Sequence, residues 1–462
     1  MPTITTRETA FGARSGLTAS AGTANGAAFS FISGPDGLME LVKDMRMSAV
    51  WAGLTAFIWY AFGALPLQIE IAAQLGLSPA QASNWVFIIW FAGSSVSILL
   101  SLICRIPLPV TWTLPGLVYL GTLGGQYSFA EIVGANLVAG IAIVALGVLG
   151  IGKRIMAWLP LPIIMGMFGG SILVFVTRMV NAAVEDAAVA GVTVASYLLG
   201  RFIGSPRVPP MGLAIGIGGI AVYCSGATSP EAVTWALPVL VTPEMTFSFS
   251  AILAIAVPMV VLAMGLGNVQ GIGFLQAQGY RVPVTKVTVI VGLTSIVNAF
   301  FGGHAATVAR AASAIIGGPE AGPRECRYWA NIVAAALCFF IAFAASCVIS
   351  LVEVLPRSFV VTLAALAILS SFPDALQKAF GSTLRFGSLA AFAVAATPFA
   401  IFGIASTFWA LLAGVAASFL TERHDLIAYW RDARSSEPRR PVAPTPSRRP
   451  SAATERPERR LG

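Results

Sequence analysis

The chain has 462 residues, of which 57% are hydrophobic and only 10% are charged. A water-soluble protein needs many more charged side chains on its surface, so this composition indicates a multi-pass membrane protein. The net charge of +8 does not indicate a nucleic-acid partner, because much of it lies in short loops and in the C-terminal stretch. The five cysteines and two histidines lack metal-ligand spacing, so we expect no metal site.

Both ends of the chain differ from this apolar body. Residues 1–33 are rich in Gly, Ala, Ser and Thr and lack the apolar core of a signal peptide. Residues 432–462 are rich in Pro and Arg, a composition that cannot build a hydrophobic core. We therefore predict a disordered cytoplasmic N-terminal arm over residues 1–44 and a disordered basic cytoplasmic tail over residues 426–462.

Fourteen apolar segments between these ends are expected to be membrane-spanning. Seven precede residue 240: Ser48–Leu75, Ala82–Ile103, Pro107–Gly125, Glu131–Ile151, Trp158–Val180, Ala187–Ile203 and Met211–Gly226. Seven follow it: Ile252–Phe274, Val284–Phe301, Gly302–Gly318, Asn331–Leu351, Ser358–Ser371, Leu389–Ile404 and Trp409–Phe419. The sequence thus predicts two seven-segment repeats, residues 45–240 and 241–425. Because seven is odd, the second repeat is inverted relative to the first.

The basic residues of the loops indicate the orientation. If the N-terminus is cytoplasmic, the cytoplasmic loops contain Lys43, Arg46, Arg105, Lys153, Arg154, Arg201, Arg207, Arg281, Lys286, Arg324, Arg327, Lys378 and Arg385. The opposite side then has chiefly Arg178 and Arg357. This asymmetry follows the positive-inside rule, so we expect both termini to lie in the cytoplasm.

The third segment of each half is interrupted. Three prolines prevent a continuous helix over Pro107–Gly125. In the second half, Gly pairs flank an apolar run, residues 305–316, that is about half of the roughly 20 residues needed to cross a bilayer. Paired interruptions of this kind indicate a transporter's binding site near the middle of the membrane. A half-helix N-terminus favours an anion, and Arg310 strengthens that preference.

Four motifs resemble the benzoate/proton symporter (BenE) family, a relative of the uracil-permease-type symporters. They are LSPAQASNWVFIIW (Leu77–Trp90), PLPVTWTLPG (Pro107–Gly116), GNVQGIGFLQAQGYRVP (Gly267–Pro283) and FFGGHAATVARAASAIIGGPEAGPRECRYW (Phe300–Trp329). The resemblance covers most of residues 45–425. It implies an all-α fold with a seven-plus-seven inverted repeat. Segments 1–4 and 8–11 would form a core domain, segments 5–7 and 12–14 a gate domain, and substrate would bind between the two interrupted segments.

The resemblance also implies the site residues. Substrate-binding positions are Trp112, Thr113, Leu114, Pro115, Gly116, Asn268, Gln270, His304, Ala305, Ala306, Thr307 and Arg310. We expect Glu70 and His304 to bind the coupled protons, because a carboxyl or imidazole group within a membrane segment is a common proton site.

Structural alternatives exist for the polar candidates. Arg310 could form an internal ion pair with Glu70 or Glu320 instead of binding an anion. Glu70 could lie in interfacial water, and His304 could cap the half-helix. Asn268 and Gln270 could satisfy backbone groups that the breaks leave unpaired. Trp112 is the aromatic residue on which an aromatic carboxylate could stack.

The sequence departs from the nucleobase carriers in lacking an acid in segment 8, around Met264, and at Ala306–Thr307. Arg310 is instead similar to sulfate-permease-type anion transporters. We expect a secondary active transporter of the cytoplasmic membrane that couples benzoate or a similar small organic carboxylate to protons. An inorganic-anion or nucleobase permease of the same fold is the alternative. An enzyme and a channel are disfavoured, since neither a catalytic pair nor a ring of charges is present. No cofactor is expected, and the resemblance implies a homodimer through the gate domain.

Overall fold

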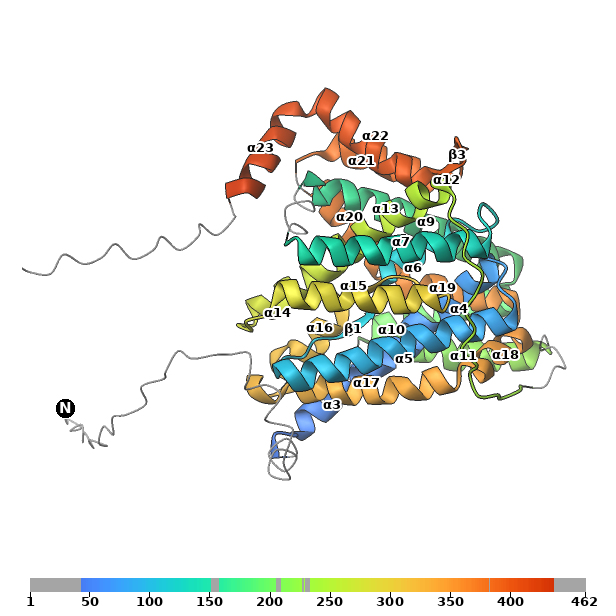
Figure 1. Ribbon diagram of the computed structural model, residues 1–462. Coiled ribbons are helices and arrows are strands. Elements are labelled where there is room, and N and C mark those ends of the chain that lie inside the picture. The colour runs from blue at the N-terminus through green and yellow to red at the C-terminus, as the bar shows by residue number, and fades with distance from the viewer. Residues whose placement is uncertain are drawn as a thin grey trace, which may run out of the picture.

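A computed structural model describes residues 43–150, 158–204, 209–226, 228, 233–381 and 383–435. The chain is mostly helical, and its long helices run side by side across the molecule (Figure 1). Six described helices are long and apolar enough to cross a membrane, or seven if one bent pair counts as a single span. Large apolar side chains such as Phe202 and Phe340 are exposed on the outer faces, as lipid contact requires.

The first half of the chain builds the elements in the expected order. They are α3 (Met47–Ile58), the π-helical η1 (Trp59–Ala64), α4 (Leu65–Gln74), α5 (Pro79–Cys104), β1 (Val110–Trp112), α6 (Leu114–Gly121), α7 (Phe129–Val148), α9 (Leu161–Glu185), the π-helical η2 (Ala187–Gly191), α10 (Val192–Ile203) and α11 (Pro210–Ser225). Capping side chains determine where two of these helices begin. Ser78 and Ser128 start α5 and α7 with capping boxes, in which each serine accepts from a backbone N–H three residues later.

The second half begins with one long helical segment that includes two π-helical stretches. It comprises α12 (Phe249–Ala251), η3 (Ile252–Ala256), α13 (Val257–Val261), η4 (Leu262–Asn268) and α14 (Val269–Ala277). The next elements are α15 (Val284–Phe300), β2 (Ala306–Val308), α16 (Arg310–Gly317), the 3₁₀ turns η5 (Pro319–Ala321) and η6 (Arg324–Cys326), and α17 (Tyr328–Phe343). The chain ends with α18 (Ala345–Val354), α19 (Arg357–Leu369), α20 (Ser371–Phe380), α21 (Arg385–Ala396), β3 (Ala400–Ile401), β4 (Ile404–Ala405), α22 (Ser406–Thr421) and α23 (Arg423–Ser435).

The two predicted interruptions are confirmed, and they meet each other. Strands β1 and β2 pair antiparallel, with Val110 opposite Val308, Thr111 opposite Thr307 and Trp112 opposite Ala306. Prolines keep the first strand out of a helix, so its backbone groups need partners from elsewhere. Within a membrane those partners must come from the protein, and the other interrupted segment supplies them. A short helix, α6 or α16, follows each strand.

Three segments differ from the sequence prediction. The segment Asn331–Leu351 is divided at Ala344 into α17 and α18. The segment Ser358–Ser371 continues through a bend of 44° into α20, whose polar residues had suggested a loop. The segment Leu389–Ile404 ends as a helix at Ala396 and becomes the β3–β4 hairpin.

The predicted disorder of residues 426–462 is wrong for their first part, because α23 is helical to Ser435. Trp430 Nε1 donates to the carbonyl of Trp158 at 2.9 Å, and the Tyr429 hydroxyl accepts from the Leu161 amide at 3.2 Å. These contacts hold α23 against the start of α9. Residues 1–42 and 436–462, together with Lys153, Arg154 and Arg207, lie outside the described residues.

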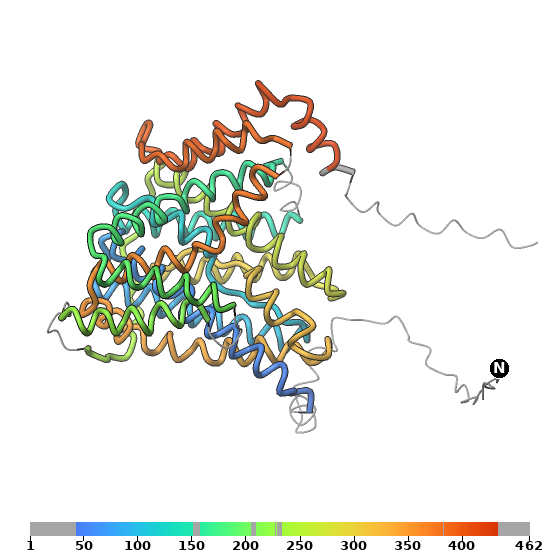
Figure 2. The backbone as a smooth tube through the Cα atoms, turned by 180° about the vertical axis from the view of Figure 1, so that it is seen from behind, coloured from blue at the N-terminus to red at the C-terminus, as the bar shows by residue number. Residues whose placement is uncertain are grey.

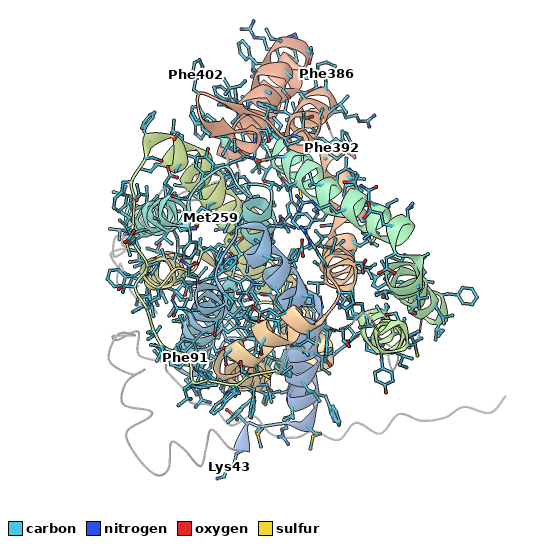
Figure 3. The ribbon with its side chains drawn as sticks, turned by 90° about the vertical axis from the view of Figure 1, so that its right-hand side faces the viewer. Lys43, Phe91, Met259, Phe386, Phe392 and Phe402 are labelled. Carbon is cyan, nitrogen blue, oxygen red and sulfur yellow. The ribbon has the colours of Figure 1, made fainter. Side chains whose placement is uncertain are left out.

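The helices pack as two groups. The first helix group comprises α3–α7 and α12–α17, and the second comprises α9–α11 and α19–α22. Figure 2 shows α10 and α11 (green) beside α19 (orange), and Figure 3 looks along the bundle from one end. The groups meet chiefly where α19 packs against η1 and α4, and where α9 packs against α6. The β1–β2 pair belongs to the first group and lies beside this junction.

Candidate functional site

A cavity of about 280 Å³ lies between the two helix groups, beside the β1–β2 pair. Its walls come from η1, β1, α6, η4, α14, β2 and α16 of the first group and from α9 and α20 of the second. The lining residues are Trp59, Tyr60, Ala64, Thr111, Trp112, Leu114, Pro115, Met165, Phe168, Leu266, Gly267, Gln270, Phe274, Thr307, Ala309, Arg310, Ala311, Ala314, Ser371 and Asp374. A site between two helix groups, beside two broken segments, is where transporters bind their cargo.

One wall of the cavity is aromatic. The Trp112 ring lies 6.0 Å from the Tyr60 ring and 4.5 Å from the Trp90 ring, measured between centroids. Trp90 is fixed in turn, since its Nε1 donates to Gln68 Oε1 at 2.9 Å. Trp112 is buried, so its orientation is set by packing rather than by solvent. Rigid aromatic surfaces of this kind suit a flat apolar ligand.

Two cavity-lining residues have a buried polar atom without a hydrogen-bond partner among the described residues. These atoms are the Tyr60 hydroxyl oxygen and the Gln270 Nε2. A buried donor without a partner costs about 1–3 kcal/mol, so its presence needs an explanation. Thr307, by contrast, is satisfied, because its hydroxyl donates to the Ala263 carbonyl at 2.8 Å. The Tyr60 hydroxyl and the Gln270 Nε2 are therefore two candidate donors for a polar ligand.

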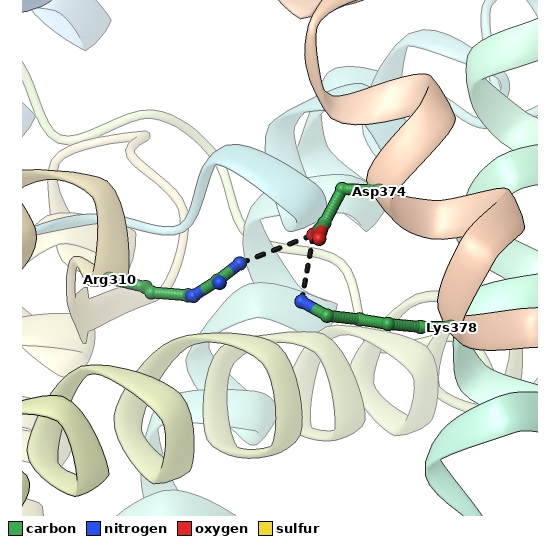
Figure 4. A network of polar contacts seen from close by, with 3 residues as sticks. All are labelled: Arg310, Asp374 and Lys378. Atoms are coloured by element: carbon green, nitrogen blue, oxygen red, sulfur yellow. Dashed lines mark hydrogen bonds and ion pairs between the residues drawn. The ribbon is translucent and has the colours of Figure 1, made fainter. Parts of the chain in front are cut away.

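Arg310 brings a positive charge to the cavity from the first residue of α16. Its Nη1 lies 3.2 Å from Asp374 Oδ2 on α20, and Lys378 Nζ lies 2.8 Å from the same oxygen (Figure 4). The side chains of Arg310 and Asp374 are 49% and 40% exposed. The internal ion pair considered for Arg310 thus exists, but its partner is Asp374 rather than Glu70 or Glu320.

The sequence-predicted residues divide into cavity residues and supporting residues. Those lining the cavity are Trp112, Leu114, Pro115, Gln270, Thr307 and Arg310. Those outside the lining are Glu70, Thr113, Gly116, Asn268, His304, Ala305 and Ala306. The supporting residues mostly hold the broken segments in place.

Asn268 and Thr113 show how this support works. The Asn268 Oδ1 accepts from the Val308 amide at 2.7 Å and lies 3.2 Å from the Thr307 hydroxyl oxygen, so η4 is tied to β2. Thr113 caps α6 by accepting from the Gly116 amide at 3.3 Å, and its own amide donates to the Ala305 carbonyl at 2.9 Å. Asn268 therefore accepts from a backbone amide that the interrupted segment leaves unpaired. This is the alternative to substrate binding that the sequence left open for this residue.

The two candidates for proton coupling are both buried. His304 is fully buried, and its Nδ1 accepts from Trp85 Nε1 at 3.2 Å, which leaves the proton on Nε2. Glu70 on α4 is 4% exposed and accepts from Gln74 Nε2 at 2.7 Å. The helix that carries Glu70, α4, packs against α19 of the second group.

Sequence reasoning missed Tyr60, Phe168 and Asp374. Tyr60 is turned into the cavity by the π-helical stretch η1, and such bulges arise from tertiary packing. Phe168 sits in an apolar run of α9 that looks like any lipid-facing helix. Asp374 could have been found from the sequence. It lies four residues before Lys378 in the apolar second half, a spacing that places the two charges on one helix face.

Close packing of α14 on β2 yields a matched pair of predictions. A Cβ at Gly271 would lie 2.4 Å from the Val308 carbonyl oxygen, whereas a Cβ at Gly273 would meet nothing within 4 Å. We expect Gly271→Ala to destabilise the protein by about 1–3 kcal/mol, because the strand must shift. Gly273→Ala, in the same helix, is expected to be neutral or slightly stabilising. Thermal unfolding of the purified variants measures both, and equal melting temperatures would contradict this packing.

Comparisons with known proteins identify the family. The family model described as "Benzoate membrane transport protein" matches residues 43–420. "Inner membrane protein YdcO" of Escherichia coli (strain K12) is 28% identical over 368 residues, covering 79% of this chain and 90% of that protein. The "Benzoate membrane transport protein" of Acinetobacter baylyi is 26% identical over 387 residues, covering 83% and 97%.

Two solved structures share the fold. The structure of SLC26A9 aligns with a TM-score of 0.59 at 12% identity, covering 83% of this chain and 66% of that chain. The murine Slc26a9 anion transporter in the inward-facing state aligns with a TM-score of 0.56 at 13% identity, covering 88% and 73%. Identity this low establishes a common fold and nothing about substrate. The family match spans most of the chain, so this protein belongs to the benzoate membrane transport (BenE) family and is a multi-pass membrane transporter rather than an enzyme.

Proposed function

We propose that the protein is a secondary active transporter that moves benzoate, or a similar small aromatic carboxylate, together with protons. The observation that carries the proposal is the composition of the cavity. Its aromatic wall, built from Tyr60 and Trp112, stands beside one cationic group, Arg310, and two unpartnered donors. A flat apolar ring with one carboxylate matches that combination.

Each part of the ligand has a defined counterpart. The ring would lie against Trp112 and Tyr60, where aromatic pairs add about 0.5–1.5 kcal/mol to the gain from burial. The carboxylate would accept from Arg310, whose planar guanidinium can donate two parallel hydrogen bonds. Tyr60 and Gln270 would use the donor groups that are otherwise unpartnered.

The architecture supports transport by alternating access. The cavity lies between the two helix groups, and we assign the first as the core domain and the second as the gate. We infer fourteen spans in a seven-plus-seven inverted repeat, with movement of the core against the gate exposing the cavity to each side in turn. We place the protein in the cytoplasmic membrane with both termini inside, and we assign the gate as the surface for a homodimer.

Replacement of Tyr60 by Phe tests the proposed carboxylate contact. We expect benzoate to bind about tenfold more weakly, because a hydrogen bond to a charged group contributes about 1.5–3 kcal/mol. Stability should not fall, since the hydroxyl has no partner among the described residues. Tyr119→Phe is the control: that hydroxyl donates to the Ala254 carbonyl outside the cavity, so stability should fall instead. Titration with labelled benzoate and thermal unfolding separate the two patterns.

Uptake of labelled benzoate into proteoliposomes tests the proposal as a whole. An inward proton gradient should drive accumulation by the wild-type protein, and dissipating the gradient should abolish it. Sulfate, bicarbonate and uracil serve as unlabelled competitors. Absence of benzoate uptake together with uptake of one of these compounds would replace the proposal by its alternative, an inorganic-anion or nucleobase permease.

A further inference from the structure

Asp374 occupies the position at which a ligand's carboxylate would meet Arg310. It is the one acid in the cavity lining among the described residues. A single oxygen, Oδ2, lies 3.2 Å from Arg310 Nη1 and 2.8 Å from Lys378 Nζ (Figure 4). Two cations therefore share one carboxylate, which leaves a net charge of one positive unit in the trio. A monoanionic ligand would balance that charge.

The ion pair also joins the two helix groups. Arg310 begins α16, which packs against α3, α14 and α17 of the first group. Asp374 and Lys378 lie one turn apart on α20, which packs against α9 and α21 of the second group. The contact between Arg310 and Asp374 thus crosses the junction beside the cavity, and any separation of the groups at this point must break it.

The exposure of the pair sets its strength. Arg310 and Asp374 are 49% and 40% exposed, so water screens their attraction. Half-exposed ion pairs change an equilibrium by less than about tenfold. Such a contact is strong enough to bias the position of Arg310 and weak enough for a ligand with several donors to displace it.

We propose that Asp374 is an internal competitor that the substrate's carboxylate displaces from Arg310. Lys378 on the same helix retains the displaced carboxylate, and the link between α16 and α20 opens. Binding is thereby coupled to release of a contact between the moving parts. Asp374 is a positioning residue, because it acts on the ligand through Arg310. This inference rests on the proposed function, since it takes a carboxylate as the ligand.

The test is binding of labelled benzoate to the purified full-length protein and its variants. Asp374→Asn is expected to tighten binding about two- to fivefold, within the range of a half-exposed ion pair. Asp374→Glu keeps the competing charge and should restore wild-type affinity. Lys378→Gln is expected to weaken binding by a similar factor, because Asp374 then remains on Arg310. Melting temperatures confirm that each variant is folded.

A second background separates displacement from simple charge repulsion. In Arg310→Gln, Asp374→Asn is expected to leave benzoate affinity unchanged, because the competitor no longer has a target. If the same tightening persists there, Asp374 acts on the anion through space and the inference is wrong. If Asp374→Asn has no effect while Arg310→Gln weakens binding, the inference fails and the proposed function stands. If the wild-type protein binds no benzoate, both fail.

Discussion

Replacing Arg310 with Gln is expected to weaken benzoate binding about 10- to 100-fold. A charge-assisted hydrogen bond contributes about 1.5–3 kcal/mol, and a factor of ten corresponds to about 1.4 kcal/mol. Part of this loss is offset, because the wild-type Arg310 must first leave Asp374, 3.2 Å away. Arg310→Lys keeps the charge but loses the planar pair of donors, so it should bind with intermediate affinity.

The measurement is equilibrium binding of labelled benzoate, with uptake into proteoliposomes as the second readout. Arg281→Gln is the matched control, since Arg281 is exposed in the loop between α14 and α15 and does not line the cavity. That variant should bind as the wild type does. If Arg310→Gln binds benzoate with unchanged affinity, Arg310 does not contact the ligand and its role is the structural ion pair with Asp374.

Much of the fold could be predicted because its signals are local. Apolar runs mark the helices, since a membrane demands about 20 such residues for each span. Pro107, Pro109 and Pro115 rule out one continuous helix over Pro107–Gly125, so the first interruption could be located to within a few residues. The antiparallel pairing of the two interruptions was not predicted, although backbone groups within a membrane must find partners in the protein.

The site was predictable only in part, because half of it depends on contacts between distant residues. Arg310 and Asp374 are 64 residues apart, and nothing in either local sequence selects the other as its partner. Tyr60 enters the cavity through a π-helical turn that the sequence of η1 does not reveal. The motif resemblance gave the candidate site residues in and around β1 and β2. Several of these candidates, such as Thr113 and Asn268, support the cavity without lining it.

The proposed coupling site leads to the second large effect. Glu70 is 4% exposed on α4, which packs against α19 of the other helix group. Burying a carboxyl group within a membrane protein costs free energy, so such a residue is a candidate for a functional role. Binding and releasing a proton as the two helix groups move would be that role. Glu70→Gln mimics the protonated side chain in charge and size. It should therefore retain benzoate exchange while losing the response to protons.

The expected result can be stated quantitatively. One proton moving down a gradient of one pH unit provides about 1.4 kcal/mol, enough for roughly tenfold accumulation of one benzoate. We expect wild-type proteoliposomes to approach that level and Glu70→Gln vesicles to equilibrate benzoate without accumulating it. Glu353→Gln, an exposed acid on α18, serves as the control and should accumulate benzoate as the wild type does. Full accumulation by Glu70→Gln would transfer the coupling role to His304. Its Nδ1 accepts a hydrogen bond while its Nε2 lacks a partner among the described residues, so His304→Asn in the same assay is the variant that would then lose accumulation.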